Sequence, residues 1–406
     1  MEQMNMFEML YDDYKLDKNK PLYVVESFAG IGSQTLALKY LGVNYVHQNI
    51  IEWAIPSIIA YASVHRHELK DYGKDFTVGM DKDTIVEELF KLGVSKDYQK
   101  PAEIKELQNI NEDRLRLCYN SIKWSNNLVD VCRVKGSDLK IEKDKEYLFT
   151  YSFPCQCLSL AGKLYNLASK DSINEDNLYD AENRSNMLWQ VGRILSECEI
   201  KPQILLCENV PMLHSQDNMP HLKEWLLTLE KLGYTSYWFD LSATECLIPQ
   251  TRVRTFIVSI LGNYNYNTPK ATKPKLKLKD LLEKNVDKKY YLSEEKLDQI
   301  RAWKSYQNPL DSVLGNESVC PTITTRIAES DRGGINASMK VYSEQLENTT
   351  NLLIKNATKR GYLEATDGDG IDISSRMESH RGTVQKDKAQ TITTMGGENV
   401  GVVIYE

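Results

Sequence analysis

The sequence predicts an α/β fold with a doubly wound, mainly parallel sheet, followed by a smaller β-rich region. Three observations predict this fold class. Apolar runs of strand length recur over about residues 22–260, and the first leads through a glycine turn into a helix-like segment. Residues suited to chemistry follow directly behind several runs, as expected where ligands bind along the carboxyl edge of parallel strands. From about residue 265 the pattern changes to short polar segments with glycine and threonine, which predicts a separate domain.

The first element of the fold is a strand, a glycine turn and a helix. The apolar run at residues 23–27 enters the turn FAGIG at residues 28–32, and the helix-like residues 34–41 follow. Glycines at such a turn let the backbone pass close to a ligand. Glu52, at the end of the next apolar run over residues 45–51, is well placed to bind ribose hydroxyls. Taken alone the glycine turn is weak evidence, because it serves many nucleotide-binding folds.

Two later strand ends hold a thiol and a carboxylate that could share one substrate. Cys155 follows the apolar run at residues 147–153, and Glu208 follows the run at residues 204–207. A thiolate is a strong nucleophile, and a nearby carboxyl group can exchange a proton with the ring that the thiolate attacks. The pair indicates covalent chemistry on a heterocycle, although a buried cysteine is more often a small inert hydrophobic residue.

A metal site is not predicted. Cys155 and Cys157 form a CxC pair, but zinc is usually held by four ligands, and no second Cys or His pair lies at a suitable spacing.

Taken in order, these motifs resemble those of the cytosine C5 DNA methyltransferases, which use S-adenosylmethionine. The resemblance covers about residues 22–260 and rests on seven motifs in the family's order. The motifs are Phe28-Ala29-Gly30-Ile31-Gly32, Glu52-Trp53, Gly136-Ser137-Asp138, Pro154-Cys155-Gln156, Arg184-Ser185 with Met187-Leu188-Trp189, Glu208-Asn209-Val210 and Gln250-Thr251-Arg252-Val253-Arg254.

The resemblance implies a Rossmann-like S-adenosylmethionine-dependent methyltransferase fold with a mixed, β-rich target-recognition domain. Glu52 and Trp53 correspond to the family's ribose and adenine contacts, and Asp138 to the acid that binds the adenine amino group. The full set of implied cofactor-binding residues is Phe28, Ala29, Gly30, Gly32, Glu52, Trp53, Asp138, Pro154 and Met187.

The resemblance also implies a mechanism in which Cys155 adds to carbon 6 of a cytosine flipped out of duplex DNA. Glu208 would hold ring nitrogen N3 and the exocyclic amino group, and Arg252 and Arg254 would bind the base carbonyl. Alternation puts both arginines on one face of the chain, which favours a shared site over ordinary surface cations. Substrate or DNA contacts are expected from Gln156, Asn209, Gln250, Arg326 and Arg376.

Composition sets further bounds. The 406 residues are 41% hydrophobic and 26% charged, which suits a chain with a sizeable core. No run of about 18 apolar residues exists, so no membrane span is expected. Eight irregularly spaced cysteines and no amino-terminal apolar signal segment favour reduced thiols in the cytoplasm. The net charge of −7 is awkward for a DNA-binding protein, so the charge is expected to be unevenly distributed.

The expected domains are a catalytic domain at residues 1–264 and a target-recognition region at residues 265–406. A lysine- and glutamate-rich stretch at about residues 66–130 has helical spacing and is expected to be an inserted surface segment. The lysine-rich residues 270–279 are interpreted as a linker or edge strand. Arginines in the second region could reach phosphates or base edges, or lie exposed on loops.

The end of the chain departs from the family pattern, because no closing motif of the Gly-Asn-Ser type follows the recognition region. This predicts either a second polypeptide that supplies the closing helix or a remnant without full activity. Two alternatives stay open: a weak or inactive DNA-binding subunit, and an RNA cytosine methyltransferase. The intact set of Cys155, Glu208, Arg252 and Arg254 argues against the first, and the large segment after residue 265 favours DNA over RNA. No motif fixes the target sequence, or decides between a restriction-modification, orphan or phage role.

Overall fold

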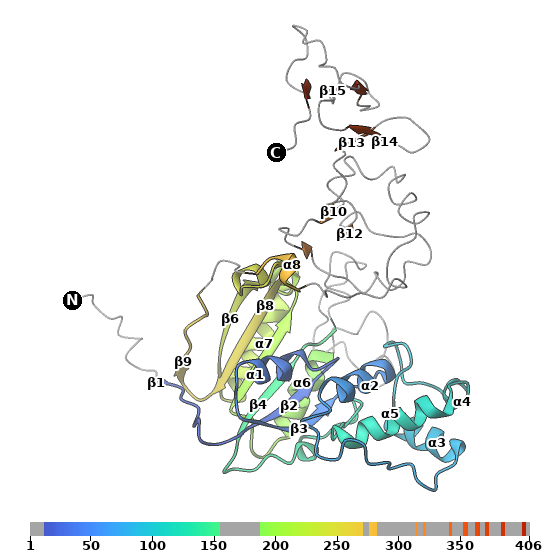
Figure 1. Ribbon diagram of the computed structural model, residues 1–406. Helices are drawn as coiled ribbons and strands as arrows, with labels where there is room; N and C mark the ends of the chain where they lie inside the picture. The colour runs from blue at the N-terminus through green and yellow to red at the C-terminus, as the bar shows by residue number, and fades with distance from the viewer. Residues whose placement is uncertain are drawn as a thin grey trace, which may run out of the picture. The chain divides into compact units, whose positions relative to one another are not determined.

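The computed structural model describes residues 12–154, 187–270 and 276–281, together with short strands between residues 313 and 402 (Figure 1). The chain divides into two compact units. The first comprises Met1–Leu241 and Val253–Lys270, and the second comprises Ser242–Arg252 and Ala271–Glu406.

A six-stranded sheet forms the centre of the first unit, in the order β3-β2-β4-β5-β8-β6. β2 pairs in parallel with β3 and β4, β4 pairs in parallel with β5, and β8 runs antiparallel to β5. This mainly parallel sheet confirms the predicted α/β fold class. The strands are β2 (Leu22–Ser27), β3 (Tyr45–Ile51), β4 (Glu146–Tyr151), β5 (Ile204–Asn209), β6 (Tyr234–Ser242) and β8 (Val253–Leu261).

Helices cover both faces of this sheet (Figure 1). Successive strand residues point to opposite faces. Phe149 and Leu205 belong to the same buried core as Trp225, while Ile50 packs with Tyr61 on the opposite face. Each large apolar side chain buried in this way contributes roughly 1.5–3 kcal/mol. The covering helices are α1 (Ser33–Tyr40) and α2 (Ile55–Val64) on one face, and α6 (Met187–Glu197) and α7 (Met219–Lys231) on the other.

The expected insertion at residues 66–130 contains three helices. They are α3 (Lys82–Leu92), α4 (Ile104–Gln108) and α5 (Glu112–Trp124). The side chain of Asp81 caps the start of α3, and Gly93, at a φ of 78°, ends it. Leu89 of α3 lies in one buried core with Ile58 of α2. These helices therefore join the packing of the first unit through α2.

The second unit contains short paired strands. β7 pairs in parallel with β11, β10 in parallel with β12, and β13 antiparallel with β14, while β15 lies between β16 and β17. Their bounds are β7 (Gln250–Thr251), β10 (Val313–Leu314), β11 (Cys320–Pro321), β12 (Val341–Tyr342), β13 (Leu352–Lys355), β14 (Tyr362–Ala365), β15 (Gly370–Asp372), β16 (Thr383–Gln385) and β17 (Val400–Val402).

The remaining described elements are short. They are β1 (Asp12–Asp13), which pairs with β9 (Tyr264–Asn265), the 3-10 helices η1 (Gly136–Leu139), η5 (Pro211–His214) and η6 (Ala243–Glu245), and α8 (Leu278–Leu281). None of the helices in the described part of the chain is long and apolar enough to cross a membrane.

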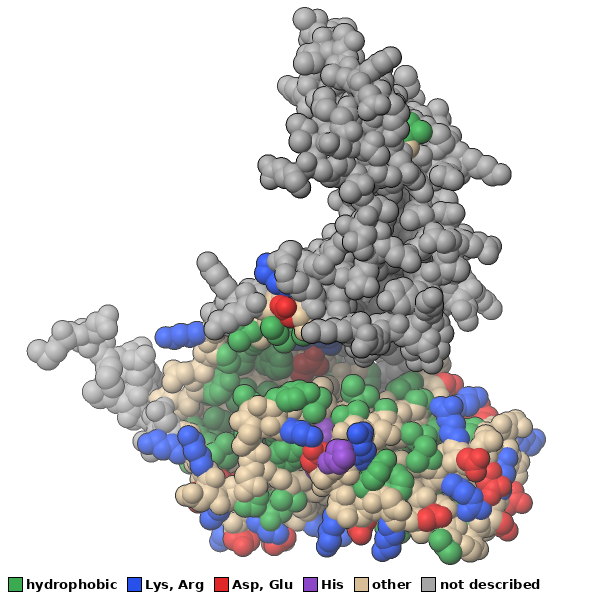
Figure 2. All heavy atoms as spheres, in the orientation of Figure 1, with side chains coloured by type: hydrophobic (Ala, Val, Ile, Leu, Met, Phe, Trp, Pro, Cys, Tyr) green, Lys and Arg blue, Asp and Glu red, His purple; other side chains and the backbone are tan. Residues whose placement is uncertain are grey.

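Charges of both signs share the surface of the first unit. On the face drawn in Figure 2, the Lys and Arg side chains of the described residues are interspersed with Asp and Glu. The uneven charge distribution expected of a DNA-binding protein therefore stays a prediction.

Candidate active site

The carboxyl edge of the sheet brings together residues that are far apart in the sequence (Figure 1). The glycine loop, residues 28–32, follows β2, and Glu52 follows β3. Pro154 lies just beyond β4, and Glu208 lies near the end of β5. Because β8 is antiparallel to β5, its beginning meets the same edge and brings Arg254 there.

The glycine loop has an unusual backbone that is fixed by its neighbours. Phe28, Gly30 and Gly32 have positive φ values of 55°, 56° and 80°. The N–H of Phe28 donates to the carbonyl of Ile51 at 2.8 Å, so the loop continues the contact between β2 and β3. A Cβ built on Gly30 would meet nothing within 4 Å. That open side leaves room for a ligand to approach the backbone.

Glu52 is the main polar anchor of this loop. Its side chain is buried, with Oε2 accepting from the N–H of Gly30 at 2.9 Å and Oε1 accepting from the N–H of Ala54 at 2.8 Å. Burial raises the pKa of the Glu52 carboxyl. Each carboxylate oxygen has two lone pairs, so the group can hold the loop and also accept from ribose hydroxyls. Trp53 is half-buried beside it and packs against the core that contains α2 and α3.

A segment that the sequence reasoning missed lies beside Glu52. The Asn127 side chain accepts from the N–H of Glu52 at 3.1 Å and donates to its carbonyl at 2.8 Å. Leu128 donates its N–H to Ile50, so this segment extends parallel to β3 toward the carboxyl edge. Asp130 follows, almost fully buried, with Oδ2 3.2 Å from the Nε of Arg133. In the sequence, an acid directly behind the apolar pair Leu128-Val129 is the signal that could have identified this segment.

Asp138 does not join these residues. It lies in η1, where its carboxylate accepts from the N–H of Lys135 at 2.8 Å and so caps its own turn. The N–H of Gly136 donates to Glu197, the last residue of α6, at 3.0 Å. Because α6 ends just before β5 begins, η1 lies toward the amino edge of the sheet. The expected contact of Asp138 with the cofactor stays a prediction.

The other residues that were expected to bind the cofactor are buried to different degrees. Ala29 is buried with Ile50 and Tyr61, and Phe28 is partly buried against the main core. Met187, the first residue of α6, is also buried in that core, with its sulfur 3.7 Å from the thiol of Cys132. These side chains support the edge by packing.

Glu208 and Arg254 form an ion pair at the other half of the edge. The Nε of Arg254 lies 2.9 Å from Oε1 of Glu208, and the two side chains are 17% and 22% exposed. Partial exposure lets a substrate reach the carboxyl group, while the guanidinium fixes its orientation. Arg254 therefore lies directly beside Glu208 in the structure.

Asn209 makes structural contacts at the end of β5. It is 2% exposed, and its Nδ2 donates to the carbonyl of Phe153 at 3.2 Å. Its Oδ1 accepts from the N–H of Val210 at 2.9 Å. A side chain this deeply buried joins the end of β5 to the backbone that leads into Pro154 and Cys155, and its expected contact with substrate or DNA stays a prediction.

Several expected site residues cannot be placed in this geometry. Cys155, Gln156, Arg326 and Arg376 lie outside the described residues. Gln250 and Arg252 belong to the second unit, where Gln250 pairs with Cys320 and the carbonyl of Arg252 accepts from Ala243. Within the described ranges, no cluster of His, Cys, Asp or Glu has the arrangement of a metal site.

Comparisons with known proteins find similar sequences and folds. The family model described as C-5 cytosine-specific DNA methylase matches residues 90–394. The chain is 32% identical over 296 residues to the type II methyltransferase M2.ScrFI of Lactococcus lactis subsp. cremoris, covering 72% of this chain and 76% of that protein. It is 30% identical over 282 residues to the orphan methyltransferase M.SssI of Spiroplasma monobiae, covering 68% and 69%. Among solved structures, S. pombe Dnmt2 methyltransferase aligns with a TM-score of 0.48 at 15% identity, covering 82% of this chain and 78% of that one.

Proposed function

Since the chain belongs to the family of C-5 cytosine-specific DNA methylases, we propose that it methylates a flipped-out cytosine in duplex DNA, with Cys155 as nucleophile and Glu208 as acid. The family's methyl donor is S-adenosylmethionine. The observation that carries the assignment of roles is the ion pair between Glu208 and Arg254 at the carboxyl edge. It holds a carboxyl group where the strand before Cys155 also ends.

The proposed chemistry begins at carbon 6, because carbon 5 of cytosine becomes nucleophilic only when a group has added beside it. The Cys155 thiolate makes this bond, and negative charge develops on the ring. Glu208 holds N3 and the exocyclic amino group and supplies the proton that stabilises this charge. S-adenosylmethionine, when bound, would supply an electrophilic methyl group for carbon 5. Loss of the carbon 5 proton to a base expels Cys155 and restores the ring.

The positioning of the nucleophile depends on the end of β5. The bond from Asn209 to Phe153 fixes the chain two residues before Cys155. Because small displacements of reacting groups cost large factors in rate, a buried tether here supports the proposed role of Cys155.

The residues of the cofactor half fit S-adenosylmethionine. The open backbone beside Gly30 and the buried carboxyl of Glu52 would hold the amino acid and ribose portions, respectively. For the adenine side we propose Asp130 in place of Asp138, because Asp130 follows the segment that lies next to Glu52. The position of Asp130 along the sheet edge supports this role.

The test is transfer of labelled methyl from S-adenosylmethionine to mixed-sequence duplex DNA, with Cys155→Ala as control. Wild-type incorporation that is lost in Cys155→Ala is the expected result. Transfer to structured RNA in preference to duplex DNA would overturn the substrate assignment, and equal transfer by both proteins would overturn the role of Cys155.

Two finer proposals accompany this function. The chain works in the cytoplasm, and a second polypeptide completes its cofactor pocket. A turnover rate of the purified chain that does not rise when host extract is added would overturn the second proposal.

A further inference from the structure

A group of polar side chains is buried behind the glycine loop, on the face of the sheet covered by α1 and α2. We name Glu26, Thr35, His47, Tyr61 and His65 the buried polar cluster. Glu26 lies in β2, two residues before the loop begins, and is 1% exposed. The other members come from α1, β3, α2 and the residue that ends α2. Side chains from four elements, β2, α1, β3 and α2, therefore contribute to this cluster.

The hydrogen bonds between members of the cluster all lead, from donor to acceptor, toward the carboxyl group of Glu26. The hydroxyl of Thr35 donates to Oε2 of Glu26 at 2.5 Å, and the hydroxyl of Tyr61 donates to the same oxygen at 3.3 Å. Nδ1 of His47 lies 3.0 Å from the Tyr61 oxygen. Because the Tyr61 proton is directed to Glu26, His47 acts as the donor to Tyr61, which requires the tautomer with hydrogen on Nδ1.

The cluster also touches the glycine loop directly. Nε2 of His65 lies 3.2 Å from the carbonyl of Ile31, so it donates a hydrogen bond to the loop backbone. A Cβ built on Gly32 would lie 2.1 Å from this nitrogen and 2.6 Å from the Tyr61 ring. The two rings therefore fill the space under Gly32, and the loop rests on them.

Such support matters because the loop has an intrinsically unfavourable backbone. Phe28 has a φ of 55°, a conformation that a bulky residue rarely adopts, and two glycines with positive φ follow. Conformations of this kind persist where the surroundings determine them. His65 and Tyr61 lie against the loop at Gly32, whereas a Cβ at Gly30 would meet open space.

The cluster keeps polar atoms buried at some cost. Oε1 of Glu26, Nε2 of His47 and Nδ1 of His65 make no hydrogen bond within the described residues. Burial raises the pKa of Glu26 to about 7 and lowers the pKa of His47 to about 4. Apolar residues of similar size would fill this space without such a penalty, so packing alone does not explain the cluster.

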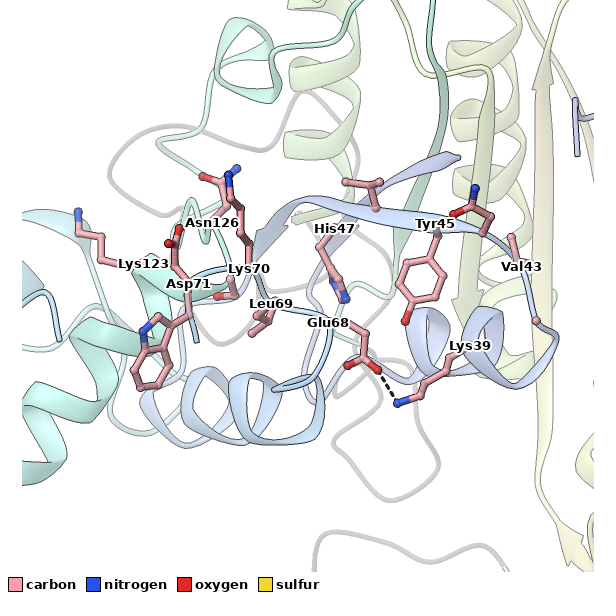
Figure 3. Close-up of a pocket in the computed structure, with 15 residues that line it drawn as sticks. Lys39, Val43, Tyr45, His47, Glu68, Leu69, Lys70, Asp71, Lys123 and Asn126 are labelled. Carbon is pink, nitrogen blue, oxygen red and sulfur yellow. Dashed lines mark hydrogen bonds and ion pairs between the residues drawn. The ribbon is translucent and has the colours of Figure 1, made fainter. Parts of the chain in front are cut away.

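On its outer side the cluster reaches an open pocket of about 750 Å³ at the amino end of β3 (Figure 3). His47 lines this pocket together with Tyr45 and Glu68, and Glu68 forms an ion pair with Lys39. The Tyr45 hydroxyl is buried without a hydrogen-bond partner among the described residues. Tyr45 thus offers a matched comparison with Tyr61: the same residue type, nearby, without a bond to Glu26.

We propose that His65, Tyr61 and Glu26 are positioning residues for the cofactor, which hold the glycine loop in the conformation that binds S-adenosylmethionine. The proposal rests on the cofactor role of this loop. His65 and Tyr61 support the loop by contact, and Glu26 holds Tyr61 in place. None of the three takes part in the bond changes at cytosine.

The experiment measures binding of S-adenosylmethionine and S-adenosylhomocysteine by calorimetry, with no DNA present. For His65→Ala we expect both dissociation constants to rise about 10-fold or more, and for Tyr61→Phe about 3-fold to 10-fold. His65→Gln, whose amide can donate to the Ile31 carbonyl, should recover part of the affinity. Tyr45→Phe should bind like the wild type. At saturating S-adenosylmethionine, kcat should stay within about 2-fold in all four variants while KM for the cofactor follows the dissociation constant.

Three results would overturn the proposal. The first is unchanged cofactor affinity in both His65→Ala and Tyr61→Phe. The second is a loss of affinity in Tyr45→Phe equal to that in Tyr61→Phe. The third is a loss in His65→Ala that His65→Gln does not recover and that is accompanied by lower duplex DNA affinity and a lower thermal midpoint, because this would indicate general destabilisation. Failure of the proposed function would look different: wild-type protein would bind the cofactor and transfer no methyl group to DNA.

Discussion

The two halves of the carboxyl edge are held in place by different kinds of interaction. At β2 and β3, a buried carboxyl group binds backbone N–H groups, and neutral side chains pack under a glycine loop. At β5 and β8, a partly exposed ion pair joins Glu208 to Arg254. The first half is held by buried hydrogen bonds and packing, whereas the second keeps a charged group accessible. A cofactor that is bound in the same way at each turnover suits the first arrangement, and a base that must enter and leave suits the second.

The largest effect should come from breaking the ion pair. Replacing Arg254 with Ala removes the donor that orients Glu208, and we expect kcat for DNA methylation to fall about 10²-fold to 10³-fold. Arg254→Lys should be intermediate, because a lysine keeps the charge without the planar fork. Cofactor affinity by calorimetry should not change. A normal kcat in Arg254→Ala would show that the ion pair does not contribute to catalysis.

The next effect separates two glycines of the same loop. Gly32→Ala combines a φ of 80° with contact against His65 and should lower the free energy of unfolding by roughly 2–5 kcal/mol. Gly30→Ala meets open space and should cost only about 1–2 kcal/mol for its φ of 56°. If the cofactor lies beside Gly30, Gly30→Ala should nevertheless lose more S-adenosylhomocysteine affinity than stability. Chemical denaturation measures the loss of stability in each variant, and calorimetry measures the loss of S-adenosylhomocysteine affinity. Equal stability losses in the two variants would refute the prediction.

A smaller effect tests the adenine-side acid. Asp130→Asn should weaken cofactor binding by about 10-fold, the scale of one hydrogen bond to a charged group. Asp138→Asn, which only loosens the cap of η1, should change it by less than about 2-fold. Equilibrium binding of S-adenosylmethionine to the two variants tests this prediction. A larger loss of affinity in Asp138→Asn than in Asp130→Asn would favour Asp138 as the adenine-side acid.

The smallest effect concerns pH and stability. Glu26 has its pKa raised from 4.5 to about 7, so the folded state binds more protons there and stability falls as pH rises through that range. His47 has its pKa lowered from 6.5 to about 4, so stability rises with pH between those values. The two trends oppose each other between about pH 4.5 and 6.5. In Glu26→Gln the unfolding free energy should therefore rise more steeply with pH in that window, by at most about 1.4 kcal/mol per unit. Urea titrations at four pH values would show it, and parallel curves for both proteins would contradict it.

The sequence predicts the strand ends well, because apolar runs fix where buried strands stop and parallel strands stop at the same edge. This logic correctly brings Glu52 and Glu208 to one edge, and the antiparallel β8 adds Arg254 there. The expectation for Asp138 rests on the resemblance of its Gly-Ser-Asp motif and not on a strand end, and its contact with the cofactor stays a prediction. Cys155 follows the same pattern, but it lies outside the described residues.

Buried polar residues were the least predictable part of the site. Glu26 sits inside an apolar run, and no local pattern shows that Thr35 and Tyr61 will surround it. The expected substrate or DNA contact of Asn209 rests on its place in the Glu-Asn-Val motif, which does not show where the side chain points. Strand residues alternate in direction, so the residue after an exposed acid is expected to point into the protein.

The pairing of β8 with β5 makes strand register a determinant of activity. Along this pair Asn209 lies opposite Thr255 and Ile204 lies opposite Ile260. A slip of β8 by one residue would turn Arg254 to the other face of the sheet and would also displace the buried side chains of Ile257 and Ile260. Ile260, at the far end of the strand from the acid, would then contribute to methylation as well as to stability, because it helps to fix the register that places Arg254. In directed evolution or natural drift, that distant strand end would look like part of the active site.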